Sequence, residues 1–163
     1  MPAVILDACS VINMINAEVI QKLEVIDGYT FHIGNLVLEE CLDEAQKIVV
    51  RQCILDGVIE PVTNDLTVRE FNSISNKYGL GKGESECIAY MKKIGAIVCT
   101  DDNKARRSIE RDFGKPFYFG SLFILREMVR QNLISCDESI RSYAIMVISG
   151  AFLPQTDESY LCQ

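Results

Sequence analysis

Acidic side chains stand at four places far apart in the chain, each where an apolar run gives way to a turn or a helix start. They are Asp7, Glu39-Glu40, Glu84-Ser85-Glu86 and Asp101-Asp102. Carboxylate oxygens are the ligands that hard divalent cations prefer, and several carboxylates in one pocket repel one another without a cation. If the fold gathers these groups, the sequence therefore predicts a divalent-metal site.

Short apolar runs alternate with segments of helical period, which is typical of an α/β fold. We expect a three-layer α/β/α sandwich with a mainly parallel central sheet, formed by residues 1–150 as a single domain. Residues 151–163 are expected to form a tail packed on this domain or extending from it. The predicted strands cover residues 3–6, 29–33, 58–62, 96–100 and 117–119. The predicted helical segments cover residues 11–23, with a break near Asn16 as the alternative, and residues 36–55, 66–78, 84–94, 104–113, 122–132 and 138–149.

Two of the acidic positions directly follow predicted strands. Asp7 comes after the apolar run 3–6, and Asp101-Asp102 come after the strand that ends at Thr100. In parallel sheets ligands bind beyond the carboxyl ends of the strands. Both positions are therefore expected at the functional edge of the sheet. One of the two aspartates is also expected to cap the next helix, which does not exclude its neighbour from holding metal.

The other two acidic positions each offer a choice of side chains. Glu84 continues the apolar stripe of its helix whereas Glu86 turns away, so periodicity favours Glu84 as a ligand. The alternative for Glu84 is a first-turn acid favoured by the helix dipole. Periodicity slightly prefers Glu39 to Glu40, and a solvated helix face explains either one equally well.

The composition is that of a globular protein. The chain has 163 residues, of which 48% are hydrophobic and 24% charged, and its formal net charge is −7. No apolar stretch reaches the length of a membrane span and no export signal stands at the start, so a cytoplasmic protein is expected. The negative charge argues against electrostatic wrapping of a long nucleic acid, so phosphate binding must depend on local basic residues.

The seven cysteines and one histidine form no recognisable metal motif. The odd count and the absence of CxxC spacing favour buried reduced thiols in a cytosolic protein, and His32, in a predicted strand, is expected to be structural. A zinc site is therefore not expected. Five cysteines lie within apolar periodic segments: Cys9, Cys41, Cys53, Cys87 and Cys99.

Two other phosphate chemistries fit poorly. Gly81-Lys82 is followed by Gly83, whereas the Walker pattern needs Ser or Thr there. A phosphoaspartate enzyme would want a second acid two residues after Asp7, where Cys9 stands.

Four segments in register resemble the PIN-domain nucleases, particularly the prokaryotic branch that includes VapC-type toxins. The resemblance implies an α/β/α fold, acids that bind Mg²⁺ or Mn²⁺, and hydrolysis of RNA phosphodiester bonds. It implies a small antitoxin partner if the protein is a toxin, and it makes a homodimer plausible. The segments are Val4–Ile12, Val37–Glu40, Gly83–Ala89 and Thr100–Arg106, with Gly120-Ser121 and Gly150–Leu153 extending the likeness.

The family pattern assigns the acids. It implies Asp7, Glu40, Glu84 and Asp102 as catalytic metal ligands, with Asp101 and Glu86 as further contributors to the metal site. Glu40 is thus chosen against the weak periodicity preference. Such a metal lowers the pKa of a bound water and stabilises charge on the phosphodiester.

Cys9 departs from the pattern, in which a small hydroxyl or amide side chain is common. A thiol is a poorer hydrogen-bond partner, so reduced activity is expected unless Ser10 or Thr100 compensates. A catalytically weak PIN-like binding or assembly module, without nuclease turnover, is therefore the alternative function. Six residues are expected to contact the nucleic acid: Lys82, Lys104, Arg106, Ser121, Ser10 and Thr100. For Arg107 and Arg111 a solvated helix face is at least as good an explanation.

Overall fold

Five short strands form the central sheet of the computed structural model, which describes residues 1–163. Every neighbouring pair is parallel, so the predicted parallel sheet is confirmed. The first strand has its predicted bounds, and the other four are shorter than predicted. The order across the sheet is β3 (Glu60–Pro61), β2 (Thr30–Ile33), β1 (Ala3–Leu6), β4 (Ile97–Cys99) and β5 (Tyr118–Phe119).

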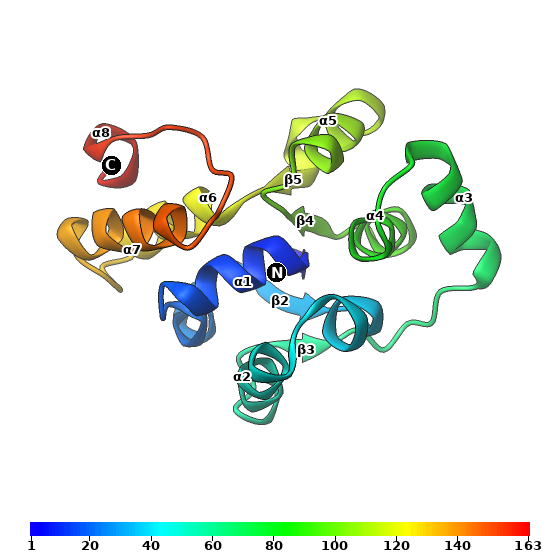
Figure 1. Ribbon diagram of the computed structural model, residues 1–163, viewed down its shortest axis with the longest axis horizontal. Coiled ribbons are helices and arrows are strands. Elements are labelled where there is room, and N and C mark those ends of the chain that lie inside the picture. The colour runs from blue at the N-terminus through cyan, green and yellow to red at the C-terminus, as the bar shows by residue number, and fades with distance from the viewer.

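Helices cover both faces of the sheet and give the expected three layers (Figure 1). On one side α1, α6 and α7 contact one another, and on the other α4 contacts β1 and β4, with α3 packed against α4. None of these helices is long and apolar enough to cross a membrane. The α-helices are α1 (Ala8–Asn16), α2 (Glu44–Leu55), α3 (Val68–Tyr78), α4 (Lys82–Ile94), α5 (Asn103–Asp112), α6 (Ser121–Arg130), α7 (Cys136–Ile148) and α8 (Glu158–Leu161). The short helical turns are η1 (Ile20–Val25), η2 (Val37–Cys41) and η3 (Lys115–Phe117).

The central strand β1 places the first acidic residue at the middle of the sheet edge. Its residues Val4–Leu6 are fully buried, because helices cover both faces of this strand. Leu6 pairs with Cys99 of β4, so the two strands end side by side at the same edge of the sheet. The backbone N–H of Asp7 continues this pairing, donating to the carbonyl of Cys99 at 2.9 Å.

The helical region predicted over residues 36–55 is two elements, and this corrects the prediction. The π-helical turn η2 ends before Leu42, and α2 begins after Asp43. The Asp43 carboxylate accepts from the backbone N–H of Gln46 at 2.8 Å, and the Gln46 side chain accepts from the backbone N–H of Asp43 at 2.9 Å. This reciprocal cap starts a new helix and separates the two acids of η2 from α2.

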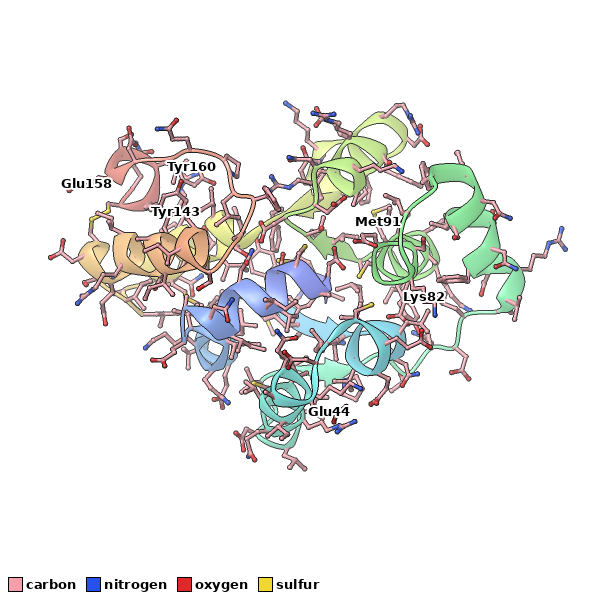
Figure 2. The ribbon with its side chains drawn as sticks, viewed as in Figure 1. Glu44, Lys82, Met91, Tyr143, Glu158 and Tyr160 are labelled. Carbon is pink, nitrogen blue, oxygen red and sulfur yellow. A yellow bond between two sulfur atoms is a disulfide. The ribbon has the colours of Figure 1, made fainter.

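The C-terminal segment is packed on α6 and α7. Leu161 is buried in the core, and the Tyr143 hydroxyl of α7 donates to the carbonyl of Pro154 at 3.1 Å. Figure 2 shows Tyr143 and Tyr160 between α7 and this segment. The Arg126 guanidinium of α6 lies 5.2 Å from the ring centre of Tyr160.

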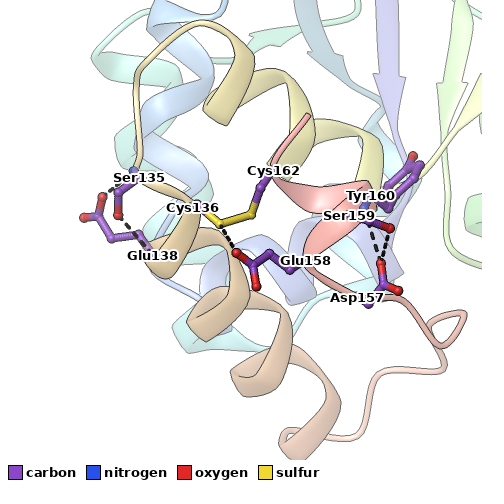
Figure 3. The surroundings of a disulfide bond; sticks show 8 residues. All are labelled: Ser135, Cys136, Glu138, Asp157, Glu158, Ser159, Tyr160 and Cys162. Carbon is purple, nitrogen blue, oxygen red and sulfur yellow. Dashed lines mark hydrogen bonds between the residues drawn. A yellow bond between two sulfur atoms is a disulfide. The ribbon is translucent and has the colours of Figure 1, made fainter.

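One disulfide closes this segment, and it corrects the expectation of reduced thiols throughout. Cys136, the first residue of α7, is bonded to Cys162 (Figure 3). The Glu158 carboxylate lies 3.9 Å from the Cys136 sulfur, which carries no hydrogen to donate. The five cysteines of the apolar segments are free, as expected.

Candidate active site

Asp7 is the most deeply buried of the predicted ligands, with 1% of its surface exposed. Its Oδ1 accepts a hydrogen bond from the backbone N–H of Ala8 at 2.8 Å. Its Oδ2 accepts from the hydroxyl of Thr100 at 2.7 Å and from the thiol of Cys9 at 3.3 Å. Burial raises the pKa of Asp7 to about 6, although these hydrogen bonds favour the charged form and act to lower the pKa. Repulsion from Glu84 adds to the rise. A nearby cation would favour the charged form of this buried carboxylate.

Cys9 serves this carboxylate as a neutral donor. Burial, followed by the charge of Asp7, raises the pKa of Cys9 to about 12, so the thiol keeps its proton at neutral pH. The sulfur also accepts from the backbone N–H of Asp101 at 3.2 Å. The residue that departs from the family pattern is thus a hydrogen-bonded part of the site.

Thr100 links Asp7 to Asp102. Its hydroxyl donates to Asp7 and accepts from the backbone N–H of Asp102 at 3.1 Å. Asp102 in turn caps α5, because its Oδ1 accepts from the backbone N–H of Ala105 at 2.7 Å. Its Oδ2 has no hydrogen-bond partner in the protein, so the capping residue also has an oxygen free for a ligand.

Glu84 is half-buried in the first turn of α4, yet its carboxylate has neither a hydrogen bond nor an ion pair with the protein. Two glycines let the backbone of this turn approach closely. A Cβ at Gly81 would lie 2.6 Å from Glu84 Oε2, and one at Gly83 would lie 3.3 Å from Asp7 Oδ1. An unpartnered carboxylate so close to a buried one is a natural cation ligand.

The two acids of η2 point to different neighbours. Arg51 of α2 binds both oxygens of Glu39, at 3.1 and 3.0 Å. Glu40 is exposed, and Lys82 in the first turn of α4 lies 2.5 Å from its Oε2. Glu40 is therefore the acid of this pair that faces the helix start where Glu84 lies. Lys82, which we expected to contact nucleic acid, is here the ion-pair partner of Glu40.

Glu86 is buried and holds the start of η2. Its carboxylate accepts from the backbone N–H groups of Leu36 at 2.8 Å and of Val37 at 3.1 Å. Burial raises the pKa of Glu86 against these two bonds. Gly34 provides the space, since a Cβ there would collide with the Glu86 carboxylate. Glu86 lines a separate cavity with Tyr90, so it fixes the segment that carries Glu40 rather than facing Asp7.

Asp101 is buried and fully hydrogen-bonded. It accepts from the side chain of Asn13 at 2.8 Å, from the hydroxyl of Ser10 at 3.3 Å, and from both the backbone N–H and the hydroxyl of Ser121. These bonds tie α1 and α6 to the end of β4. We expected Ser10 and Ser121 to contact nucleic acid. In the structure their hydroxyls instead donate hydrogen bonds to Asp101.

The two basic residues predicted on α5 are also engaged with the protein. Lys104 donates to the carbonyl of Gly79 at 2.7 Å and stays exposed. Arg106 donates to the carbonyl of Thr100 at 3.0 Å, and its guanidinium lies 5.5 Å from the ring centre of Tyr118. Arg106 therefore braces the segment that carries the site.

The predicted ligands approach one another without closing into a tight cluster. No three of their carboxylates have oxygens within 4.8 Å of one another. The group that meets this distance is Cys136, Glu158 and Cys162, whose two sulfurs are bonded to each other and so cannot bind a metal as thiolates.

A cavity of about 420 Å³ opens beside the site. Glu84, Asp101 and Asp102 line it, and its other lining residues include Asn16, Asn103 and Phe152, for which the sequence predicted no role. Nothing in the sequence marks the two asparagines, because their common position depends on how α1 packs beside the end of β4. Phe152 lies in Gly150–Leu153, where the sequence showed only a family likeness.

A family model for DUF3368, described as a PIN domain, matches residues 3–153. This range contains all five strands and all the predicted acidic ligands. No curated protein and no solved structure matches the chain.

Proposed function

Because the chain belongs to the PIN-domain family, we propose that it is a divalent-metal-dependent endoribonuclease. PIN domains are generally nucleases that use divalent metals and act on nucleic acid. RNA as substrate, Mg²⁺ or Mn²⁺ as the metal and kinship with VapC-type toxins are the parts that go beyond family membership.

One observation carries the proposal: a buried acid at the centre of the sheet edge has two other acids around it. Thr100 links Asp7 to Asp102, and the charge of Glu84 contributes to the raised pKa of Asp7. Asp102 Oδ2 and both Glu84 oxygens lack protein partners. Repulsion among these groups is unfavourable unless a cation neutralises it.

The donor set fits a hard divalent cation. Asp7, Glu84 and Asp102 would hold it through oxygen atoms, as such cations prefer. When bound, the metal supplies an activated water and stabilises charge on the phosphodiester. Glu40 is the proposed fourth ligand. To bind the metal, its carboxylate would have to break its ion pair with Lys82.

The surrounding residues orient these ligands. The Thr100 hydroxyl and the Cys9 thiol fix Asp7, and Asp101 anchors the end of β4 through four hydrogen bonds. We propose that Lys82, Lys104 and Arg106 lie along the path of the RNA backbone, where their charge offsets the acidic surface. The hydroxyls of Ser10, Thr100 and Ser121 donate hydrogen bonds to Asp101 or Asp7. Their proposed contact with RNA would require these hydrogen bonds to break. Asp101 and Glu86 are assigned as supports, with metal contact only if their present bonds exchange.

The proposal includes a biological setting. A toxin of this family would pair with a small antitoxin protein, and a homodimer is consistent with the family. The proposed location is the cytoplasm, a compartment in which disulfides such as Cys136–Cys162 are rare.

The second candidate is a PIN-like binding or assembly module with little or no turnover. Two observations favour it: the acids do not close into a tight cluster, and Lys82 neutralises Glu40. A module of this kind would bind RNA without cleaving it.

The test is cleavage of fluorescently labelled RNA of mixed sequence by the purified full chain. We expect cleavage with Mn²⁺, none with EDTA, and a loss in Asp7→Asn greater than the roughly 10- to 100-fold typical of outer-shell changes. Glu40→Gln is compared with Glu39→Gln, a matched control because Glu39 pairs with Arg51. Cleavage that persists in EDTA contradicts the proposal, and metal-dependent binding without cleavage favours the second candidate.

A further inference from the structure

The cavity beside Asp102 is lined by two chemically different kinds of residue. Its lining includes the acids Glu84, Asp101 and Asp102 and also the uncharged residues Asn16, Asn103 and Phe152. Its volume of about 420 Å³ falls within the range of small-ligand sites, roughly 300–1,000 Å³. A single nucleoside unit is a ligand of suitable size.

The charge of the lining selects which part of a nucleotide belongs there. The lining contains three acidic residues, Glu84, Asp101 and Asp102, and no Lys or Arg. A phosphate among these groups would be repelled except where a cation lies between them. Without a cation the cavity therefore suits an uncharged group, and in a nucleotide that group is the base.

Phe152 offers a flat apolar surface to this cavity. Its side chain is 89% exposed, the largest value among the exposed large apolar residues of the chain. The turn that presents it is hydrogen-bonded to α7: Gly150 has a φ of 101°, and the Ala151 N–H donates to the carbonyl of Met146 at 3.0 Å. Unpaired bases stack on aromatic side chains placed in this way.

Two amide side chains are free to meet the edge of such a base. Asn16 and Asn103 are exposed, and their side chains form no hydrogen bond within the protein. Asn13, also in the lining, differs because its amide donates to Asp101 at 2.8 Å. A free amide offers both donors and an acceptor, which match the polar atoms of base edges.

Resting on the proposed ribonuclease function, we propose that this cavity receives one unpaired base of a single-stranded RNA. The base stacks on Phe152 and its edge faces Asn16 and Asn103. The adjoining phosphate then lies toward Asp7, Glu84 and Asp102. A base within a duplex is paired and stacked on its neighbours, so it cannot enter the cavity in this way.

An apolar contact with a second copy is the competing use of this surface. Ile148, four residues before Phe152, is 86% exposed. Both residues are apolar and exposed, one at the end of α7 and the other in the segment that follows it. Burial of these two residues between two copies would change the sedimentation of the protein, which the experiment measures directly.

The experiment uses Phe152→Ala and Phe152→Trp, with Leu55→Ala as the matched surface control. Leu55 is 81% exposed at the end of α2 and does not line the cavity. Binding of a short labelled RNA, single-stranded or annealed to its complement, is measured by fluorescence anisotropy with Mn²⁺. This RNA carries phosphorothioate linkages that resist cleavage, so that the proposed metal ligands are kept intact. Cleavage is measured in the same chains on the unmodified RNA, and each variant is checked by circular dichroism and analytical ultracentrifugation.

We expect Phe152→Ala to weaken single-strand binding by about 5- to 150-fold. Phe152→Trp and Leu55→Ala should bind as the parent does, and the duplex should bind weakly to all variants. Wild-type cleavage with unchanged binding by Phe152→Ala overturns the inference and leaves the nuclease proposal standing. Loss of self-association in Phe152→Ala, with unchanged RNA binding by its monomer, assigns the surface to a dimer and also overturns the inference. A wild-type chain that neither binds nor cleaves RNA removes the proposed function, and the inference with it.

Discussion

The hydroxyl of Thr100 donates a 2.7 Å hydrogen bond to Asp7, although the two residues lie 93 positions apart. The register of the sheet brings them together, because β1 and β4 are parallel neighbours and Leu6 pairs with Cys99. The same hydroxyl accepts from the backbone of Asp102. One small side chain thus sets the relative positions of two proposed metal ligands.

Replacement of Thr100 tests this positioning role. Thr100→Val keeps the shape but removes the hydroxyl, so kcat/KM on RNA should fall by roughly 10- to 100-fold. Thr100→Ser keeps the hydroxyl and should retain most of the activity. Mn²⁺ affinity, measured by calorimetry, should fall in the Val variant alone. Wild-type affinity and kcat/KM in Thr100→Val would show that this hydroxyl does not position Asp7.

The buried charge of Asp7 should make the metal-free protein sensitive to pH. The pKa of Asp7 is about 6 in the folded protein against an ordinary value of 3.8, so the folded state binds this proton more tightly than the unfolded state. The stability that protonated Asp7 contributes is therefore lost as pH rises from 3.8 to about 6. Its loss amounts to about 2–3 kcal/mol.

Urea unfolding in EDTA across this pH range measures the effect. Subtracting the free energy of unfolding of Asp7→Asn from that of the wild type cancels the contributions of other titratable groups. We expect this difference to decline as pH rises. Saturating Mn²⁺ at neutral pH should restore stability to the wild type but not to the variant. A difference that stays flat across the range would contradict the burial argument.

How far the sequence predicts this structure depends on how local each signal is. The bounds of β1 follow from Ala3–Leu6 alone, because a strand covered on both faces must be apolar throughout. The position of Asp7 at the sheet edge follows directly. The division of the helical region at Asp43 was also readable, since Asp43 and Gln46 have the spacing of a capping box.

Other features depend on contacts between distant segments and have no local signal. The choice of Glu40 over Glu39 depends on Lys82 and Arg51, which lie on different helices. Glu86 turns away from the helix stripe as periodicity predicts, yet it is buried, because η2 covers that side of α4. The pairing of Cys136 with Cys162 likewise depends on how the last segment packs against α7.

Neighbouring Asp101 and Asp102 should respond oppositely to substitution. Asp101→Ala leaves buried donors of Asn13 and Ser121 without their acceptor, which should lower the free energy of unfolding by about 2–4 kcal/mol. Asp102→Ala removes a helix cap and should cost about 1 kcal/mol while abolishing metal-dependent cleavage. Chemical denaturation and cleavage assays on both variants check this. A stable Asp101→Ala protein that has lost only its activity would reverse the two assignments.

The disulfide should contribute measurably to stability. Cys136–Cys162 closes a loop with a sequence separation of 26, for which the chain-entropy model gives about 3–4 kcal/mol. For a domain of this size, reduction should lower Tm by roughly 10 °C. Thermal unfolding followed by circular dichroism, with and without dithiothreitol, measures the shift.

A Cys136→Ser/Cys162→Ser variant provides the control, because reductant should no longer affect its Tm. Cys53→Ser, which alters a free buried thiol, should keep the response to reductant. A wild-type Tm that reductant leaves unchanged would show that the bond contributes nothing to stability.

The central claim is that Asp7, Glu84 and Asp102 share a divalent cation. Anomalous scattering from a crystal of the full chain soaked in Mn²⁺ tests it most directly, with Asp7→Asn soaked in parallel. We predict an anomalous peak within bonding distance of carboxylate oxygens from Asp7 and Asp102, with Glu84 bound directly or through water, and no such peak in Asp7→Asn. A saturated crystal without a peak at this edge, or with Mn²⁺ bound by other residues, would contradict the account.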